Sequence, residues 1–114
     1  MTSVVVQHLG PGLAVAPQLS PEAMDWVAQQ GFRSVINNRP DFEAGPEQPT
    51  SASIQAAASA AGLAYAHLPV APNLQSPEEI ARFAQLLQTL PTPILAFCRT
   101  GTRSGKLFAA ATRG

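Results

Sequence analysis

The amino-acid sequence predicts an α/β domain, in which a mostly parallel central sheet of about five strands is flanked by helices. Short apolar runs alternate along the chain with segments of helical periodicity, and a length of 114 residues fits one such domain. The last apolar run leads through a glycine-containing turn into a helix. This order is typical of parallel strands joined by crossover helices, where the carboxyl ends of the strands border a common crevice.

Strands and a helix are predicted in the first third of the chain. Residues 4–6 and 13–16 are apolar runs, and the Gly-Pro-Gly sequence between them predicts a turn. A helix is predicted over 20–31, because Ser20 is a favourable N-cap, proline follows at the first helical position and a glycine ends the segment. Residues 33–37 are predicted as the next strand.

The middle of the chain is predicted to alternate between loop, helix and strand. Residues 38–50 contain three prolines and one glycine without periodicity, which predicts a long loop of the kind that often carries function. A helix is predicted over about 51–61 and a strand over 64–68. Another helix is predicted after Ser76, which begins a capping-box pattern and is followed by apolar side chains at helical spacing.

The composition of the chain argues against several classes of partner and cofactor. Seven basic and seven acidic residues give a formal charge of zero without a basic run, so no nucleic-acid partner and no membrane partner are predicted. One cysteine precludes an internal disulfide, and the two histidines have no metal-ligand spacing with it, so no metal and no cofactor are predicted. The amino terminus lacks the pattern of a signal peptide, and no segment reaches membrane-spanning length. A cytoplasmic location is therefore predicted.

The single cysteine follows the last apolar run. Cys98 stands at the predicted carboxyl end of the strand that ends at Phe97, and the final helix is predicted to begin at Ser104. A free cysteine is often a small buried hydrophobe, but packing alone requires neither a glycine three positions later nor an arginine five positions later. The segment therefore predicts an anion-binding loop whose amides, helix end and guanidinium favour a thiolate.

Four segments of the chain, residues 12–20, 31–41, 67–70 and 98–104, together resemble the bacterial family called beta-lactamase hydrolase-like protein, phosphatase-like domain. The resemblance covers nearly the whole chain. That family is similar in fold to the dual-specificity, cysteine-dependent phosphatases, and related domains are fused to enzymes that oxidise sulfide and persulfide. The resemblance thus implies a dual-specificity-phosphatase-like fold.

The resemblance also implies roles for the residues of the loop. Cys98 would be the nucleophile, Arg103 would hold the oxyanion, and Ser104 would stabilise the thiolate or help it leave. The residues between the cysteine and the arginine would line the anion-binding cradle. They are Arg99, Thr100, Gly101 and Thr102.

Two departures from the pattern of typical phosphatases keep other functions open. Four residues separate the cysteine from the arginine where those phosphatases have five, and four is the spacing of many rhodanese-type sulfurtransferase loops. Those phosphatases also place an aspartate general acid in the loop that corresponds to residues 69–75, which contains none here. Asp41 or Glu43 is the candidate substitute. Arg39 would add positive potential at the crevice mouth or be a solvated loop residue.

Three functional hypotheses follow. The first is a cysteine-dependent phosphatase with a thiophosphate intermediate, the second is a sulfurtransferase that forms a Cys98 persulfide, and the third is a non-catalytic anion- or partner-binding module. The first hypothesis predicts a phosphorylated substrate and the second a substrate that carries sulfane sulfur. In either case the substrate would be a small molecule or a protein. Family members generally continue beyond the helix after the loop, so a single domain over residues 1–114 without that continuation is expected. Apolar surface left uncovered motivates the hypothesis of a homo-oligomer.

Overall fold

A hairpin and three crossover connections build the sheet. In the computed structural model, which describes residues 5–112, five strands lie in the order β1-β2-β5-β3-β4. The first pair is antiparallel and every other neighbouring pair is parallel, which confirms the predicted α/β class with a mostly parallel sheet. The strands are β1 (Gln7–Gly10), β2 (Leu13–Ala16), β3 (Ser34–Asn37), β4 (Ala64–His67) and β5 (Ile94–Phe97).

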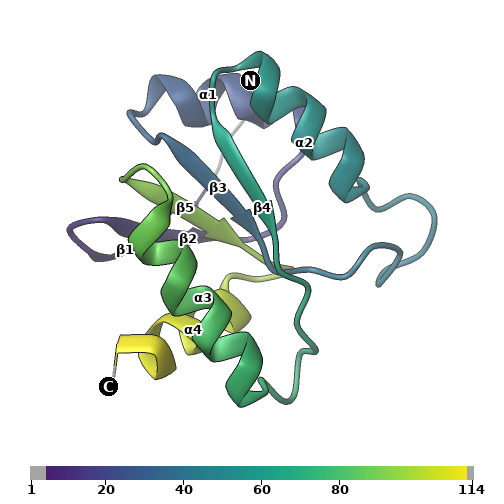
Figure 1. The fold of residues 1–114 in the computed structure, drawn as a ribbon. Helices are drawn as coiled ribbons and strands as arrows, with labels where there is room; N and C mark the ends of the chain where they lie inside the picture. The colour runs from purple at the N-terminus through teal and green to yellow at the C-terminus, as the bar shows by residue number, and fades with distance from the viewer. Residues whose placement is uncertain (1–4, 113–114) are drawn as a thin grey trace.

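Helices cover both faces of the sheet, as Figure 1 shows. The helices are α1 (Met24–Gln29), α2 (Ser51–Ala60), α3 (Pro77–Thr89) and α4 (Thr102–Thr112), with a 3₁₀ turn, η1 (Pro21–Ala23), before α1. Because successive strand residues point to opposite sides, Leu95 and Phe97 of β5 join the core under α1 and α2. Ile94 and Ala96 join the core under α3 and α4. Burial on both faces explains why this strand is a continuous apolar run.

The register of the central strands brings three loops to one edge of the sheet. Phe97, the last residue of β5, lies opposite Ala16 of β2 and Asn37 of β3. Each of these residues ends its strand, so the segments that follow all leave the sheet at the same place. This edge is the carboxyl edge at which ligand sites of open α/β sheets lie.

The first strand lies later in the sequence than predicted. The prediction placed it at residues 4–6, of which residue 4 lies outside the described range, whereas β1 is Gln7–Gly10 and directly precedes the turn at Pro11 and Gly12. A tight hairpin pairs the residues next to its turn. Because β1 is also an edge strand with exposed side chains, it lacks the apolar run that marks a buried strand.

Two helix starts also differ from the prediction. The side chain of Ser20 makes no capping hydrogen bond; its carbonyl accepts from the Ala23 amide at 3.1 Å and begins the 3₁₀ turn instead. The last helix begins at Thr102, two residues before the predicted start at Ser104. Gly101 has a φ of 93°, which turns the chain sharply enough for α4 to start close to the cysteine.

Other sequence signals are confirmed. The side chain of Ser76 accepts from the Glu79 amide at 3.1 Å while the Glu79 carboxylate accepts from the Ser76 amide at 2.8 Å, which is the capping box at the start of α3. Residues 38–50 contain neither helix nor strand. Within the described part of the chain, every helix is too short or too polar to cross a membrane.

Candidate active site

Cys98 lies at the carboxyl edge of the sheet, directly after its central strand. The side chain is 1% exposed, and its amide donates to the Ala16 carbonyl at 3.4 Å. The sulfur accepts a hydrogen bond from the Gly101 amide at 3.1 Å, and α4 begins one residue later. A backbone amide and the N-terminus of a helix therefore both lie close to the sulfur.

Gly101 is needed for this turn because of its backbone conformation. Its positive φ is one that residues with a side chain rarely adopt. A Cβ atom at this position would be in van der Waals contact with the backbone of Ala16 in β2, at 3.4 Å from the carbonyl carbon. The glycine thus lets the loop pack against β2 while its amide reaches the sulfur.

Arg103 lies in the first turn of α4 and is held at one edge of its guanidinium. Nη1 donates to Glu43 Oε2 and to the Val70 carbonyl, each at 3.0 Å, and Nη2 donates to Glu43 Oε1 at 3.1 Å. Nε is buried and has no partner among the described residues. A guanidinium has five N–H groups in one plane, so Nε–H and the second hydrogen of Nη2 remain as a parallel pair of donors.

This free edge matters because Arg103 shares a hollow with Cys98. The hollow has a volume of about 180 Å³ and opens among Pro72, Cys98, Arg99, Thr100, Thr102 and Arg103. A buried N–H without a partner is costly, and a tetrahedral or planar oxyanion can accept from two parallel donors at once. A hollow lined by a cysteine and by an arginine with unused donors is suited to an oxyanion beside a nucleophile.

A second, larger hollow also borders the loop. It has a volume of about 670 Å³ and is lined by α4, by the end of β2 and by residues in and before β1, with Thr100 and Thr102 common to both hollows. Size alone would favour it as a ligand site. We assign the chemistry to the smaller hollow, because only that one is lined by Cys98 and Arg103.

Glu43 binds two arginines and is a poor candidate for the predicted general acid. Besides its two contacts with Arg103, it accepts from Arg39 Nε at 2.8 Å. Burial by itself would raise the pKa of the Glu43 carboxyl, but hydrogen bonds and charges from Arg103 and Arg39 outweigh it and hold the pKa below its ordinary value. The group is therefore ionised and orients Arg103. Arg39 is only 5% exposed, so it is not a solvated loop residue.

Glu43 should also stabilise the fold in a pH-dependent way. A carboxyl whose pKa is lower in the folded state adds stability above its unfolded pKa, and loses it as the pH falls through the folded pKa. We expect Glu43→Gln to lower the free energy of unfolding at about pH 7 by about 1–3 kcal/mol, because an amide cannot neutralise two guanidinium groups. The loss should shrink below pH 4.5, the ordinary pKa of the group.

Thermal unfolding at a series of pH values measures this effect. Glu47→Gln is the matched control, because Glu47 is an exposed carboxylate of the same loop. If the two variants showed the same dependence on pH, the bridging role of Glu43 would be refuted.

Ser104 is hydrogen-bonded to the residue that follows β3. Its hydroxyl donates to Asn38 Oδ1 at 2.8 Å, and the Asn38 amide donates to the Leu68 carbonyl at 3.0 Å, which fixes the orientation of that amide. The hydroxyl proton is thus used by Asn38 rather than by Cys98, in contrast to the role that the resemblance implies. The bond instead ties the first turn of α4 to the residue that follows β3.

Asp41 is hydrogen-bonded to the first residue of α2. Its Oδ1 accepts from the Ser51 amide at 2.7 Å, and Asp41 is an exposed residue.

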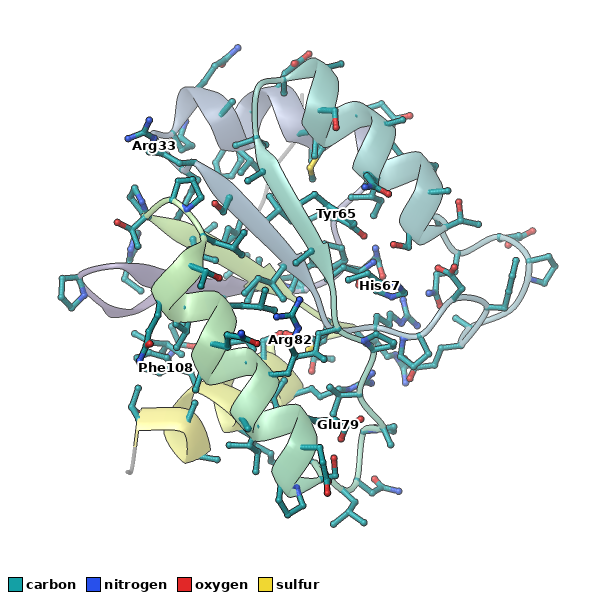
Figure 2. All side chains as sticks on the ribbon, in the orientation of Figure 1. Arg33, Tyr65, His67, Glu79, Arg82 and Phe108 are labelled. Atoms are coloured by element: carbon teal, nitrogen blue, oxygen red, sulfur yellow. The ribbon has the colours of Figure 1, made fainter. Side chains whose placement is uncertain are left out.

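His67, at the end of β4, donates through Nε2 to the Arg39 carbonyl at 2.9 Å. Figure 2 shows His67 and Tyr65 along β4, with His67 toward the carboxyl end. Neither Asp41 nor His67 lines the hollow that contains Cys98.

The structure brings together most of the residues predicted for the site and adds two. Cys98, Arg103 and the cradle residues Arg99, Thr100 and Thr102 line one hollow, and Gly101 contacts the sulfur. Asn38 and the Val70 carbonyl were not predicted as part of it. The position of Asn38 directly after a predicted strand, at the edge where ligands bind, is the signal that could have found it. Among residues 5–112, no three potential ligands of the His, Cys, Asp or Glu type cluster as a metal site would require.

Comparison with known proteins identifies related sequences. The family model described as beta-lactamase hydrolase-like protein, phosphatase-like domain, matches residues 6–114. The beta-lactamase hydrolase-like protein of Xylella fastidiosa (strain Temecula1 / ATCC 700964) is 38% identical over 97 residues, which are 85% of this chain and 22% of that protein. The chain thus spans about a fifth of the length of the curated relatives that it matches.

Solved structures show the same fold. A Neisseria meningitidis Z2491 protein, proposed to be a phosphatase, has a TM-score of 0.83 and 35% sequence identity, and the match covers 90% of this chain and 72% of that one. A mutant form of Tk-PTP has a TM-score of 0.75 and 20% identity, and the match covers 93% of this chain and 69% of that one. These similarities confirm the predicted dual-specificity-phosphatase-like fold.

Proposed function

Because the chain belongs to the family of beta-lactamase hydrolase-like protein, phosphatase-like domains, we propose that it is a cysteine-dependent phosphatase with Cys98 as nucleophile. The observation that supports this proposal most directly is that Cys98 and Arg103 line one hollow, while the buried Nε of Arg103 has no hydrogen-bond partner among the described residues. A nucleophile and a planar pair of cationic donors are the two groups that transfer of a phosphoryl group to a thiolate requires.

The reaction would proceed in two steps. The Cys98 thiolate attacks phosphorus, so that an S–P bond forms and the P–O bond to the leaving group breaks, with the electron pair passing to the leaving oxygen. Water then attacks the thiophosphate, the S–P bond breaks, phosphate is released and the proton of the water passes to solvent. Arg103 would hold the equatorial oxygens in both steps through Nε–H and Nη2–H.

Neighbouring residues would keep this geometry in place before substrate arrives. Glu43 accepts from Nη1 and Nη2 of Arg103. This leaves the other edge of the guanidinium, formed by Nε and Nη2, without a carboxylate. Asn38 holds the first turn of α4 through Ser104. Preorganised charge of this kind lowers a barrier because no reorganisation is needed during the reaction.

Sulfur transfer is the second candidate. Its support is the four-residue spacing between Cys98 and Arg103, together with the engagement of Glu43 by two arginines. With thiosulfate as donor, the Cys98 thiolate would attack the sulfane sulfur, an S–S bond would form, and sulfite would leave with the electrons of the broken bond. A sulfite anion leaves without a proton donor, so this route does not need a general acid.

Intact-protein mass spectrometry distinguishes the two candidates. The protein is exposed briefly to 4-nitrophenyl phosphate or to thiosulfate, and the reaction is quenched in acid. The mass of the intact protein is then measured, and the modified peptide is identified by peptide mapping. We expect a phosphoryl adduct on the peptide that contains Cys98 after the phosphate ester. Protein alkylated with iodoacetamide is the matched control, since Cys98 is the only cysteine of the chain. Gain of one sulfur from thiosulfate, with no phosphoryl adduct, would instead establish the second candidate.

A further inference from the structure

The hollow around Cys98 offers a substrate positive charge and hydroxyls but no ordinary proton donor. Its lining consists of the cysteine, two arginines, two threonines and a proline. Within the part of the chain that the structure describes, this lining contains no carboxylic acid and no imidazole. An arginine stays protonated throughout the physiological range and does not give up its proton. A leaving group in this hollow therefore meets positive charge without an acid.

The two carboxylates that the sequence offers as candidate acids are already engaged elsewhere. Glu43 is ionised by its contacts with Arg39 and Arg103, so it has no proton to give at neutral pH. Asp41 accepts from the Ser51 amide at 2.7 Å, which ties it to the start of α2. Residues 69–75, which run beside the hollow through Pro72, contain no aspartate, glutamate or histidine.

From this chemistry we propose a substrate class, and the proposal rests on the phosphatase function proposed above. The site hydrolyses phosphate groups whose leaving oxygen departs as a stable anion, such as activated aryl phosphates, acyl phosphates and phosphoanhydrides. Attack by the Cys98 thiolate forms the S–P bond while the P–O bond breaks, and the electron pair stays on an aryloxide, carboxylate or phosphate oxygen. No proton is needed at that moment. Alkyl esters, whose alkoxides require protonation, are poor substrates.

A series of substituted phenyl phosphates tests the proposal. The value of kcat/KM reports all steps through the departure of the first product, so its dependence on the acidity of the phenol measures how much charge the leaving oxygen carries. A positioned general acid contributes about 10²–10⁴-fold, mainly to poor leaving groups. We therefore expect kcat/KM to fall by at least about 10²-fold from 4-nitrophenyl phosphate to phenyl phosphate, since unsubstituted phenols have a pKa of about 10.

Two further substrates and one variant complete the test. Acetyl phosphate and inorganic pyrophosphate should be cleaved with kcat/KM comparable to that of 4-nitrophenyl phosphate, and glycerol phosphate should be cleaved at least about 10²-fold more slowly. Asp41→Asn should leave the dependence on phenol acidity unchanged. If Asp41 donated a proton, the variant would lose activity chiefly toward phenyl phosphate.

The outcomes separate this inference from the proposed function. Phosphate release that depends on Cys98 but varies little with the acidity of the phenol would overturn the inference and leave the phosphatase function standing. A steeper dependence in Asp41→Asn would overturn it as well, because it would identify Asp41 as the acid. Folded protein that releases no phosphate from any member of the series, and forms no phosphoryl adduct, would overturn the proposed function and with it the inference.

Discussion

Cys98→Ser is expected to reduce phosphate release by at least about a thousandfold while the fold is kept. A serine hydroxyl beside the same amide is not ionised at neutral pH, and the hollow contains no base among the described residues that could activate it. Removing the nucleophile of a hydrolase leaves only the contribution of binding and of the oxyanion donors. Phosphate release from 4-nitrophenyl phosphate measures the loss.

The same substitution should change stability little. Serine is close to cysteine in size, and its oxygen can accept the Gly101 amide that now donates to the sulfur at 3.1 Å. Cys98→Ala is the matched control, because alanine is equally inactive as a nucleophile but leaves that buried amide without an acceptor. We expect the alanine variant to be less stable than the serine variant by about 1–3 kcal/mol. Full turnover in either variant would show that Cys98 is not the nucleophile.

The parts of the site that lie close together in sequence could be predicted. Cys98 and Gly101 are three residues apart, and the strand before them and the helix after them each have their own sequence signal. The same holds for the capping box at Ser76, whose two hydrogen bonds join residues three apart. Local backbone chemistry decides such features, so neither a register nor a partner from another element is needed to predict them.

The contacts that orient the catalytic groups could not be predicted, because they join distant segments. Arg103 and Glu43 are 60 residues apart, and Ser104 and Asn38 are 66 apart. A carboxylate in a proline-rich loop looks the same in sequence whether it is solvated or paired with a buried arginine. Only the pairing of β3 with β5 brings the loop that contains Glu43 to the edge where α4 begins. The sequence could therefore offer Glu43 only as a candidate acid, because its two arginine partners could not be predicted.

Arg103→Lys should reduce kcat/KM for 4-nitrophenyl phosphate by about 10²–10³-fold, the effect of losing one preorganised oxyanion donor. An ammonium keeps the charge but replaces a planar pair of donors by a single point, so it cannot contact two oxygens of one phosphoryl group in parallel. Lysine can still reach either Glu43 or the hollow, but it cannot bind both in the way that the two edges of the guanidinium do. The loss should therefore fall on transition-state stabilisation more than on folding.

Binding and stability measurements separate that loss from a loss of structure. Inhibition by vanadate, which adopts the geometry of the transferring phosphoryl group, should weaken in Arg103→Lys in parallel with kcat/KM, because both depend on the same pair of donors. Arg33→Lys is the matched control, since Figure 2 places Arg33 at the opposite end of the sheet and its side chain is exposed. Retention of wild-type kcat/KM in Arg103→Lys would mean that the charge at this position suffices. The free edge of the guanidinium, on which the proposed phosphatase mechanism depends, would then have no part in catalysis.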